Sequence, residues 1–159
     1  MKAPQKPDAA RAALMGRVRQ KDTRPEQAVA AALRSLGAAY RKNVRGLPGS
    51  PDFANKSRKW AVFVHGCFSH RHTGCLRATT PKANRDFWLE KFTANRLRDA
   101  RAIRALRRMG FKVAIVWECG SADAGLRLSK ILEPRRVDMT GAVDHRGVVV
   151  DVSGLGRGR

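Results

Sequence analysis

Long apolar segments and acidic side chains are what this sequence has least of. No apolar run approaches the ~18 to 20 residues that a membrane-spanning helix requires. The opening residues, MKAPQKPDAARAALMGRVRQ, lack the apolar core of a secretory signal. We therefore expect a cytoplasmic protein that does not enter a membrane.

Cysteine is also scarce. The chain has three cysteines, an odd number that does not suit a disulfide framework and that fits a compartment where thiols stay reduced. No internal repeat divides the sequence. Its 159 residues are enough for one compact domain with its own hydrophobic core.

The shortage of acidic residues leaves a strong positive charge. Thirteen Asp and Glu residues stand against 33 Lys and Arg, which gives a formal net charge of +20. Such a charge attracts polyanions, because each phosphate that a cation neutralises releases counterions. Nucleic acid is the simplest partner of this kind, but the charge alone does not indicate a reaction.

Apolar periodicity predicts alternating helices and strands. Thr23 and Glu26, three residues apart, resemble a capping box that begins a helix. The expected elements are a helix over 23–37, strands over 52–54, 60–65 and 112–117, and a helix over 84–109. This order predicts an α/β fold: a single domain with a central mixed sheet flanked by helices.

Composition also suggests how the chain is divided. We expect a basic N-terminal arm over 1–22 that is loose or ordered only by a partner. One folded domain is expected over 23–133. A C-terminal segment over 134–159 is rich in turn residues, so we expect it to be partly flexible, with one weak strand over 148–152.

Cysteine and histidine cluster in one short stretch. Three of the four histidines and two of the three cysteines fall within residues 65–75, and the third cysteine follows the strand expected over 112–117. A closed tetrahedral zinc site uses four such ligands and leaves no open position for chemistry, so its role would be structural. The four candidate ligands are Cys67, His72, Cys75 and Cys119. The alternative is that the cysteines are small buried hydrophobic residues.

Two histidines and two carboxylates remain for chemistry. His65 and His70 lie beside the expected zinc ligands, and a neutral imidazole can take a proton from water in phosphodiester hydrolysis. Asp52 could hold Mg²⁺, which prefers a few carboxylates together with water and phosphate oxygens. Asp99 lies on the apolar stripe of the long helix, so it needs a partner such as His65 or His70.

Each carboxylate also has a plainer interpretation. Asp52 alone reads as a turn cap, and Asp99 as the partner of Arg96 or Arg98 in an ion pair. Only the combination of carboxylates, unassigned histidines and basic charge favours a nuclease. The competing class is a zinc-stabilised DNA-binding protein without catalysis.

Several motifs in register resemble one family. They are GSPDF over 49–53, VFVHGCF over 62–68, HRHTGC over 70–75, FWLEK over 87–91 followed by Asn95 and Asp99, and VWEC over 116–119. Over roughly residues 12–120 the sequence resembles the very short patch repair (Vsr) DNA mismatch endonucleases. The resemblance implies a fold like that of type II restriction endonucleases. It also implies a nick 5′ of the thymine in T:G mismatches left by deamination of 5-methylcytosine.

The resemblance assigns roles to particular residues. It implies Asp52 and the Val64 backbone carbonyl as ligands of catalytic Mg²⁺, His70 as general base, His65 and Asp99 as assisting groups, and Glu26 as an acidic residue near the active centre. The zinc ligands of the family fall on the four residues already named from their spacing. The partner implied is double-stranded DNA with a T:G mismatch. We expect a monomer, with other mismatch-repair proteins as candidate partners.

The same resemblance implies apolar wedges at the mismatch. Phe68 and Trp88 match two aromatic residues that enter the base stack, and Met15 matches a residue that enters from the other groove. Arg71 and Asn95 are further expected DNA contacts. Unstacking costs a few kcal/mol per step and least at a poorly stacked mismatch, so wedges turn that weakness into selectivity.

One position departs from the family pattern. The family usually has Trp after the Phe of the zinc loop, where this chain has Ser69. Serine cannot stack on a base pair, so the intercalating platform is smaller. This leaves open a nuclease of the same family with altered mismatch specificity.

Overall fold

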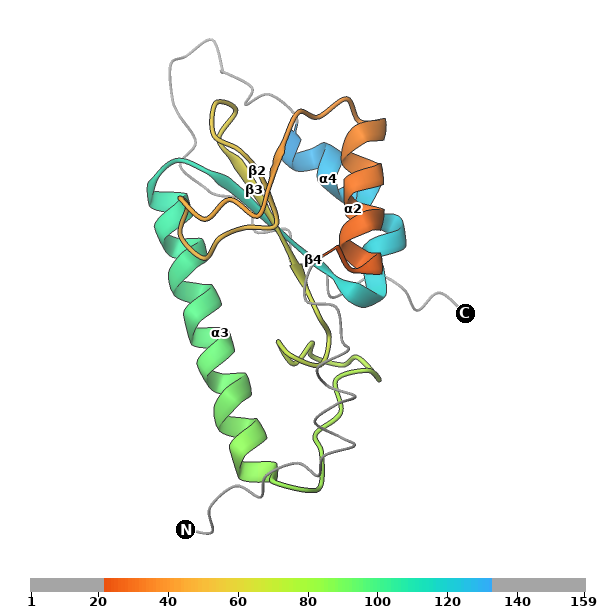
Figure 1. The fold of residues 1–159 in the computed structure, drawn as a ribbon, viewed down its shortest axis with the longest axis vertical. Coiled ribbons are helices and arrows are strands. Elements are labelled where there is room, and N and C mark those ends of the chain that lie inside the picture. Colours follow the sequence, from red (N-terminus) through yellow and green to blue (C-terminus); the bar gives the residue numbers. More distant parts are fainter. Residues whose placement is uncertain (1–21, 133–159) are drawn as a thin grey trace.

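The structure is a computed structural model that describes residues 22–132 (Figure 1). The expected N-terminal arm, apart from Asp22, and the expected C-terminal segment with its strand over 148–152 lie outside the described residues, as does Met15. The division into arm, domain and tail therefore stays a prediction. Within residues 22–132, no helix is both long and apolar enough to cross a membrane.

The described residues form an α/β domain around one mixed sheet. The sheet order is β1-β2-β3-β4, with β1–β2 and β2–β3 antiparallel and β3–β4 parallel. Figure 1 shows α3 along one side of the sheet and α2 with α4 on the other. The elements are α2 (Arg24–Ser35), β1 (Arg41–Lys42), β2 (Phe53–Asn55), β3 (Trp60–His65), α3 (Arg85–Arg108), β4 (Lys112–Trp117), the 3-10 helix η1 (Glu118–Asp123) and α4 (Ala124–Leu132). The predicted fold class is confirmed.

Alternation along β3 creates two hydrophobic cores. Trp60 and Val62 pack in the cluster that includes the buried faces of α2 and α4, whereas Ala61 and Phe63 pack in the cluster that includes α3. Successive side chains of a strand point to opposite faces of the sheet. His65, two residues beyond Phe63, therefore lies on the α3 face, and this places it within reach of polar residues on α3.

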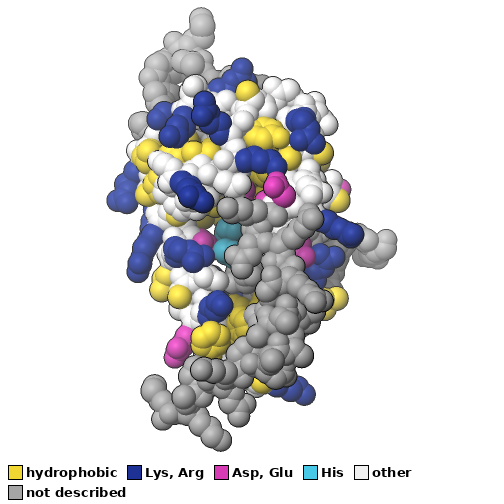
Figure 2. All heavy atoms as spheres, in the orientation of Figure 1, with side chains coloured by type: hydrophobic (Ala, Val, Ile, Leu, Met, Phe, Trp, Pro, Cys, Tyr) yellow, Lys and Arg dark blue, Asp and Glu magenta, His cyan; other side chains and the backbone are white. Residues whose placement is uncertain are grey.

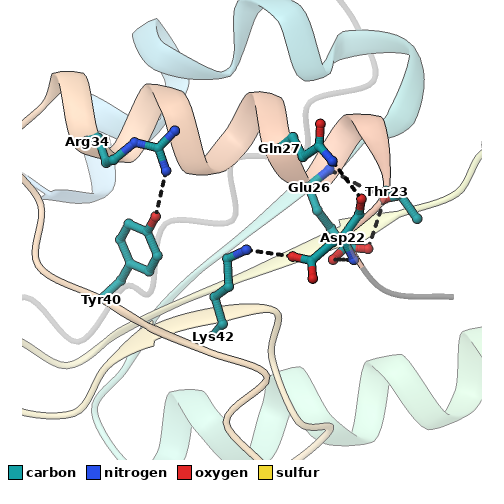
Figure 3. Close-up of polar contacts among 7 residues, drawn as sticks. All are labelled: Asp22, Thr23, Glu26, Gln27, Arg34, Tyr40 and Lys42. Carbon is teal, nitrogen blue, oxygen red and sulfur yellow. Dashed lines mark hydrogen bonds and ion pairs between the residues drawn. The ribbon is translucent and has the colours of Figure 1, made fainter. Parts of the chain in front are cut away.

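The start of α2 has the N-cap half of the predicted capping box, while the Glu26 carboxylate bonds the Asp22 N–H in place of the Thr23 N–H (Figure 3). Thr23 is the N-cap, and its hydroxyl oxygen accepts a hydrogen bond from the Glu26 backbone N–H at 3.5 Å. The Glu26 carboxylate accepts hydrogen bonds from the Thr23 hydroxyl and the Asp22 backbone N–H, both at 2.9 Å. Lys42 of β1 pairs with Asp22 at 2.6 Å. These contacts fix the Glu26 side chain in the first turn of α2.

Three elements were not predicted from the sequence: β1, η1 and α4. Of these, α4 carries a readable signal, because Ala124, Leu128 and Ile131 are buried at helical spacing. By contrast, β1 has two exposed residues and thus no burial pattern. The other expected elements are found, with the short strand starting at Phe53 rather than Asp52.

Gly49 allows the turn before Asp52 to pack tightly against α3. Its φ is +74°, and a Cβ there would lie 2.5 Å from the Ala102 Cβ and 3.2 Å from the Phe63 ring. We expect Gly49→Ala to lower the free energy of unfolding by about 2 to 5 kcal/mol, since a left-handed backbone cost adds to overpacking. Urea denaturation would measure this.

Gly37→Ala is the matched control for that measurement. Gly37 has a similar φ of +63°, but a Cβ there would meet nothing within 4 Å. Only the backbone cost of about 1 to 2 kcal/mol should then be seen. Equal destabilisation by the two substitutions would show that packing against Ala102 is unimportant.

Candidate active site and metal centre

In the loop that follows β3, His70 and His72 lie in two different clusters of side chains. Short turns shape it: the His70 N–H donates to the Gly66 carbonyl at 3.2 Å, and the His72 N–H donates to the Cys67 carbonyl at 2.9 Å. Arg71, between the two histidines, has a left-handed φ of +48°. His70 lies against Asp99 and His72 against the cysteines. An uncommon backbone conformation thus separates a candidate catalytic residue from a candidate metal ligand.

The four expected zinc ligands lie together. Their ligand atoms are all within 4.8 Å of one another. His72 Nδ1 lies 3.7 Å from Cys67 Sγ and 3.3 Å from Cys119 Sγ. A tetrahedral zinc ion with ordinary bond lengths holds a sulfur and a nitrogen ligand about 3.5 Å apart. The residues of this cluster, which also includes Cys75, therefore fit a structural zinc ion in both donor type and spacing.

Neighbouring side chains hold this cluster in place. The Glu118 carboxylate accepts a hydrogen bond from the Cys67 backbone N–H at 3.2 Å and lies 3.6 Å from the Arg77 guanidinium. The Trp117 indole stacks on His72, with ring centroids 4.2 Å apart and planes 7° apart. The ring orientation of His72 is therefore set by packing as well as by the cysteines.

Two of the thiols have opposite electrostatic surroundings. Burial raises the pKa of Cys67 to about 12. A hydrogen bond from the Arg77 backbone lowers the pKa of Cys75. A buried thiol with so high a pKa stays protonated on its own, whereas a bound cation favours the thiolate. Zinc is the ion that this donor set would hold, and it would cross-link the loop to the end of β4.

His70 and Asp99 form the closest polar contact of the second cluster. His70 Nδ1 lies 2.5 Å from Asp99 Oδ2. Burial works to raise the pKa of Asp99, but the hydrogen bond and charge of His70 outweigh it and leave that pKa below its ordinary value. An ionised Asp99 accepts the Nδ1–H of His70, which leaves the Nε2 lone pair able to take a proton.

His65 braces His70 rather than competing with it as a base. The two imidazoles stack with centroids 3.9 Å apart and planes 8° apart, and His65 Nε2 is 3.9 Å from Asp99 Oδ2. Burial, followed by the charge of His70, lowers the pKa of His65 to about 3. His65 is therefore neutral and a weak proton acceptor. The alternative partner of Asp99 is also present, since the Arg98 guanidinium lies 3.7 Å from Oδ1.

Asp52 lies just before β2 and is tied to the backbone of β3, one residue before His65. Its Oδ2 accepts a hydrogen bond from the Val64 backbone N–H at 2.7 Å. Burial raises the pKa of Asp52 against the effect of that hydrogen bond; the charge of Glu26 adds to the rise, and that of His70 opposes it. A half-buried carboxylate with a second one nearby is stabilised by a hard divalent cation. Asp52 thus fits Mg²⁺ binding, and the Val64 carbonyl as a further ligand stays a prediction.

Sequence comparison places this chain in a family. Residues 5–76 match the family model described as DNA mismatch endonuclease Vsr. The type II nicking enzyme V.XorIIP of Xanthomonas oryzae pv. oryzae is 47% identical over 124 residues, which cover 76% of this chain and 90% of that enzyme. The chain belongs to the Vsr family. It is a DNA endonuclease, and DNA is its substrate.

Two further relatives support the same conclusion. The type II nicking enzyme V.NmeAIP of Neisseria meningitidis is 43% identical over 109 residues, covering 69% of this chain and 77% of the relative. The DNA mismatch endonuclease Vsr of Escherichia coli is 40% identical over 111 residues, covering 70% of each chain. The resemblance drawn from the motifs is confirmed.

The aromatic residues expected at the DNA of this Vsr-family protein form one cluster. Phe68 and Trp88 pack edge to face at 5.1 Å, and both contact Phe92, at 5.4 and 5.8 Å. Both are half-buried. Phe87, which was not among the predicted DNA contacts, is 43% exposed, and its ring centroid lies 5.6 Å from that of Trp88. The position of Phe87 in the FWLEK motif, next to Trp88, was the sequence feature that could have predicted its place in this aromatic cluster.

Arg71 and Asn95 help to shape the loop. The Arg71 guanidinium hydrogen-bonds the Thr80 hydroxyl and lies 5.6 Å from the centroid of the Phe92 ring. Asn95 of α3 donates to the Ser69 carbonyl at 2.9 Å. Figure 2 shows histidine side chains at the surface on a face with many Lys and Arg side chains. The contacts of Arg71 and Asn95 with DNA stay predictions, but in the structure both side chains help to hold the loop against α3.

Proposed function

We propose that this Vsr-family endonuclease nicks one strand of duplex DNA at a T:G mismatch, 5′ of the thymine. The observation that carries the proposal is the His70–Asp99 contact of 2.5 Å, together with an Asp52 carboxylate held on the Val64 backbone next to His65. The names of the relatives also support it, since one is a mismatch endonuclease and others are nicking enzymes.

The side chains divide the hydrolysis between them. His70 Nε2 takes the proton of the attacking water, and Asp99 holds Nδ1–H and stabilises the imidazolium that forms. The water oxygen bonds to phosphorus while the bond from phosphorus to the leaving oxygen breaks. Asp52 is the side chain that would hold Mg²⁺, which when bound polarises the phosphate and stabilises the leaving oxygen. His65 keeps the His70 ring in place.

A single active site fits a single cut. Among residues 22–132, one cluster combines histidines with a carboxylate, and it is this one. A monomer with one such site hydrolyses one phosphodiester bond per binding event. Nicking rather than double-strand cleavage therefore follows if the expected monomer is the active form.

Ser69 favours a second candidate, a nuclease of the same family with a different mismatch preference. Ser69 is exposed, and its carbonyl is held by Asn95, so the position is fixed but offers no ring to the base stack. Aromatic stacking on a base is worth about 1 to 3 kcal/mol. Its absence removes part of the energy that would select one mismatch over another.

Nicking rates on a panel of duplexes test both candidates. The panel holds T:G, the other mismatches and a matched duplex of the same sequence. We expect the wild type to nick T:G fastest and the matched duplex slowest. We expect Ser69→Trp to nick T:G about tenfold faster relative to the matched duplex, because the new ring can stack on a base.

Ser69→Ala is the control, because it changes the side chain without adding a ring. Equal rates on matched and mismatched duplexes would overturn the mismatch assignment. A wild-type preference for another mismatch would replace the first candidate with the second. A Ser69→Trp profile like that of Ser69→Ala would remove Ser69 from the account of specificity.

A further inference from the structure

A cleft of about 230 Å³ opens beside the catalytic histidines. Its lining includes His70 and Asp99 but neither Asp52 nor Glu26, so it extends from the cluster toward α3, β4 and the zinc loop. Ile103, Ile115 and Trp117 form its apolar part. The volume is several times the ~30 Å³ that a water molecule occupies in the liquid, which is room for a phosphodiester group.

Two arginines give this cleft its charge. Arg71 follows His70 directly, and Arg96 lies one helical turn before Asp99 on α3; both line the cleft. Asp99 is the one carboxylate among the lining residues, and it is already bonded to His70 and close to Arg98. The cleft therefore carries excess positive charge next to the candidate base.

The two guanidinium groups differ in how they are held. Arg71 hydrogen-bonds Thr80 and lies over Phe92, which ties it to the loop. Arg96 is exposed, and within residues 22–132 no carboxylate forms an ion pair with it. An exposed guanidinium at the rim of a cleft can turn its planar donors toward two oxygens of one phosphate.

We propose that this cleft binds the backbone phosphate next to the scissile one on the cut strand, with Arg96 as its principal ligand. The proposal rests on the proposed function, which places the scissile phosphate between His70 and Asp52. Arg96 lies one turn of α3 from Asp99 and lines the same cleft as His70, so its long side chain can reach the phosphate beside the one that His70 serves.

This contact would align the cut strand. One strand phosphate held by Arg96 and the next by Asp52 with its ion would fix the direction of the strand across His70. Phosphate contacts of this type position the DNA without reading its sequence. Arg96 would then set the register of the cut, while the aromatic cluster responds to the mismatch.

Neutralising single phosphates tests the assignment. Mismatched duplexes are made with one neutral methylphosphonate at a time on either side of the nick, and nicking and binding are measured for wild type and Arg96→Gln. For wild type, neutralising the adjacent phosphate should weaken binding or slow nicking about tenfold. With the natural duplex, Arg96→Gln should already bind more weakly or nick more slowly than wild type by a similar factor. Neutralising the adjacent phosphate should then cause no further loss in this variant.

Arg104→Gln is the matched control, since Arg104 is an exposed arginine of α3 that does not line the cleft. It should respond to every neutral phosphate as wild type does. The slope of log binding constant against log salt should also fall by about 0.9 for Arg96→Gln, the value for one lost phosphate contact.

If Arg96→Gln loses as much binding and nicking as wild type at every neutralised phosphate, the cleft is not the site of the adjacent phosphate. Binding is measured without divalent ion, so this readout holds even if nicking shows no mismatch preference. If the protein nicks matched and mismatched duplexes equally but Arg96→Gln still abolishes the effect of one neutral phosphate, the phosphate site in the cleft stands and only the proposed mismatch specificity is wrong.

Discussion

Replacing His70 with Ala is expected to lower the single-turnover nicking rate by about 10² to 10⁴-fold, the usual contribution of general-base catalysis. DNA binding should be unchanged, because the charge that attracts DNA lies on many other side chains. His70 is the histidine whose Nδ1 proton is held by Asp99, and its stacked neighbour His65 is a weak base. Nicking rates and DNA affinity, measured together, separate loss of chemistry from loss of binding.

Two further variants sharpen that result. Asp99→Asn should also slow nicking, because an amide does not stabilise an imidazolium as a carboxylate does. Leu76→Ala, at a position 94% exposed in the same loop, should nick like the wild type. Undiminished nicking by His70→Ala would show that His70 is not the general base.

The second large effect concerns the Cys/His cluster. Purified protein should contain about one equivalent of zinc, and Cys119→Ser should lose the metal and the folded state. Structural zinc contributes about 10 to 16 kcal/mol in small zinc-binding peptides, which rivals the whole stability of a domain. Metal analysis together with thermal unfolding would measure both losses.

Leu76→Ala, next to Cys75, again serves as control and should keep its zinc. A Cys119→Ser variant that folds normally without zinc would contradict the structural role. Wild-type protein that contains no zinc after purification without chelators would do the same.

Trp117 connects the zinc centre with the catalytic histidines. In the parallel pairing of β3 with β4, His65 is the register partner of Trp117. Trp117 stacks on the zinc ligand His72 and meets His65 edge to face at 5.4 Å. Loss of zinc should therefore disturb the packing that holds His65 against His70, and nicking should be lost along with the metal.

The elements with strong apolar patterns could be predicted from the sequence. The strands over Trp60–His65 and Lys112–Trp117 have the predicted bounds, because long apolar runs are buried on both faces of the sheet. The exposed strand Arg41–Lys42 has no such pattern, since it forms only through pairing with β2. Pattern reasoning finds buried segments, whereas edge segments depend on their neighbours.

The candidate site shows the same division. The zinc cluster could be expected from spacing, because three of its four ligands are local in the sequence. The contacts of Asp52 with Val64 and of His65 with Trp117 depend on strand register, which the apolar pattern of the sequence does not determine. The choice of His70 over His65 as partner of Asp99 depends on the turn after β3, in which the His70 N–H bonds the Gly66 carbonyl.

Strand-resolved nicking is the most direct test of the proposed T:G mismatch activity. A duplex with one T:G mismatch, labelled on each strand in turn, is incubated with the protein with and without Mg²⁺. We predict a single cut on the thymine strand, 5′ of the thymine, and only when Mg²⁺ is present. Cleavage of both strands, an equal cut in the matched duplex, or cutting without a divalent ion would contradict this function.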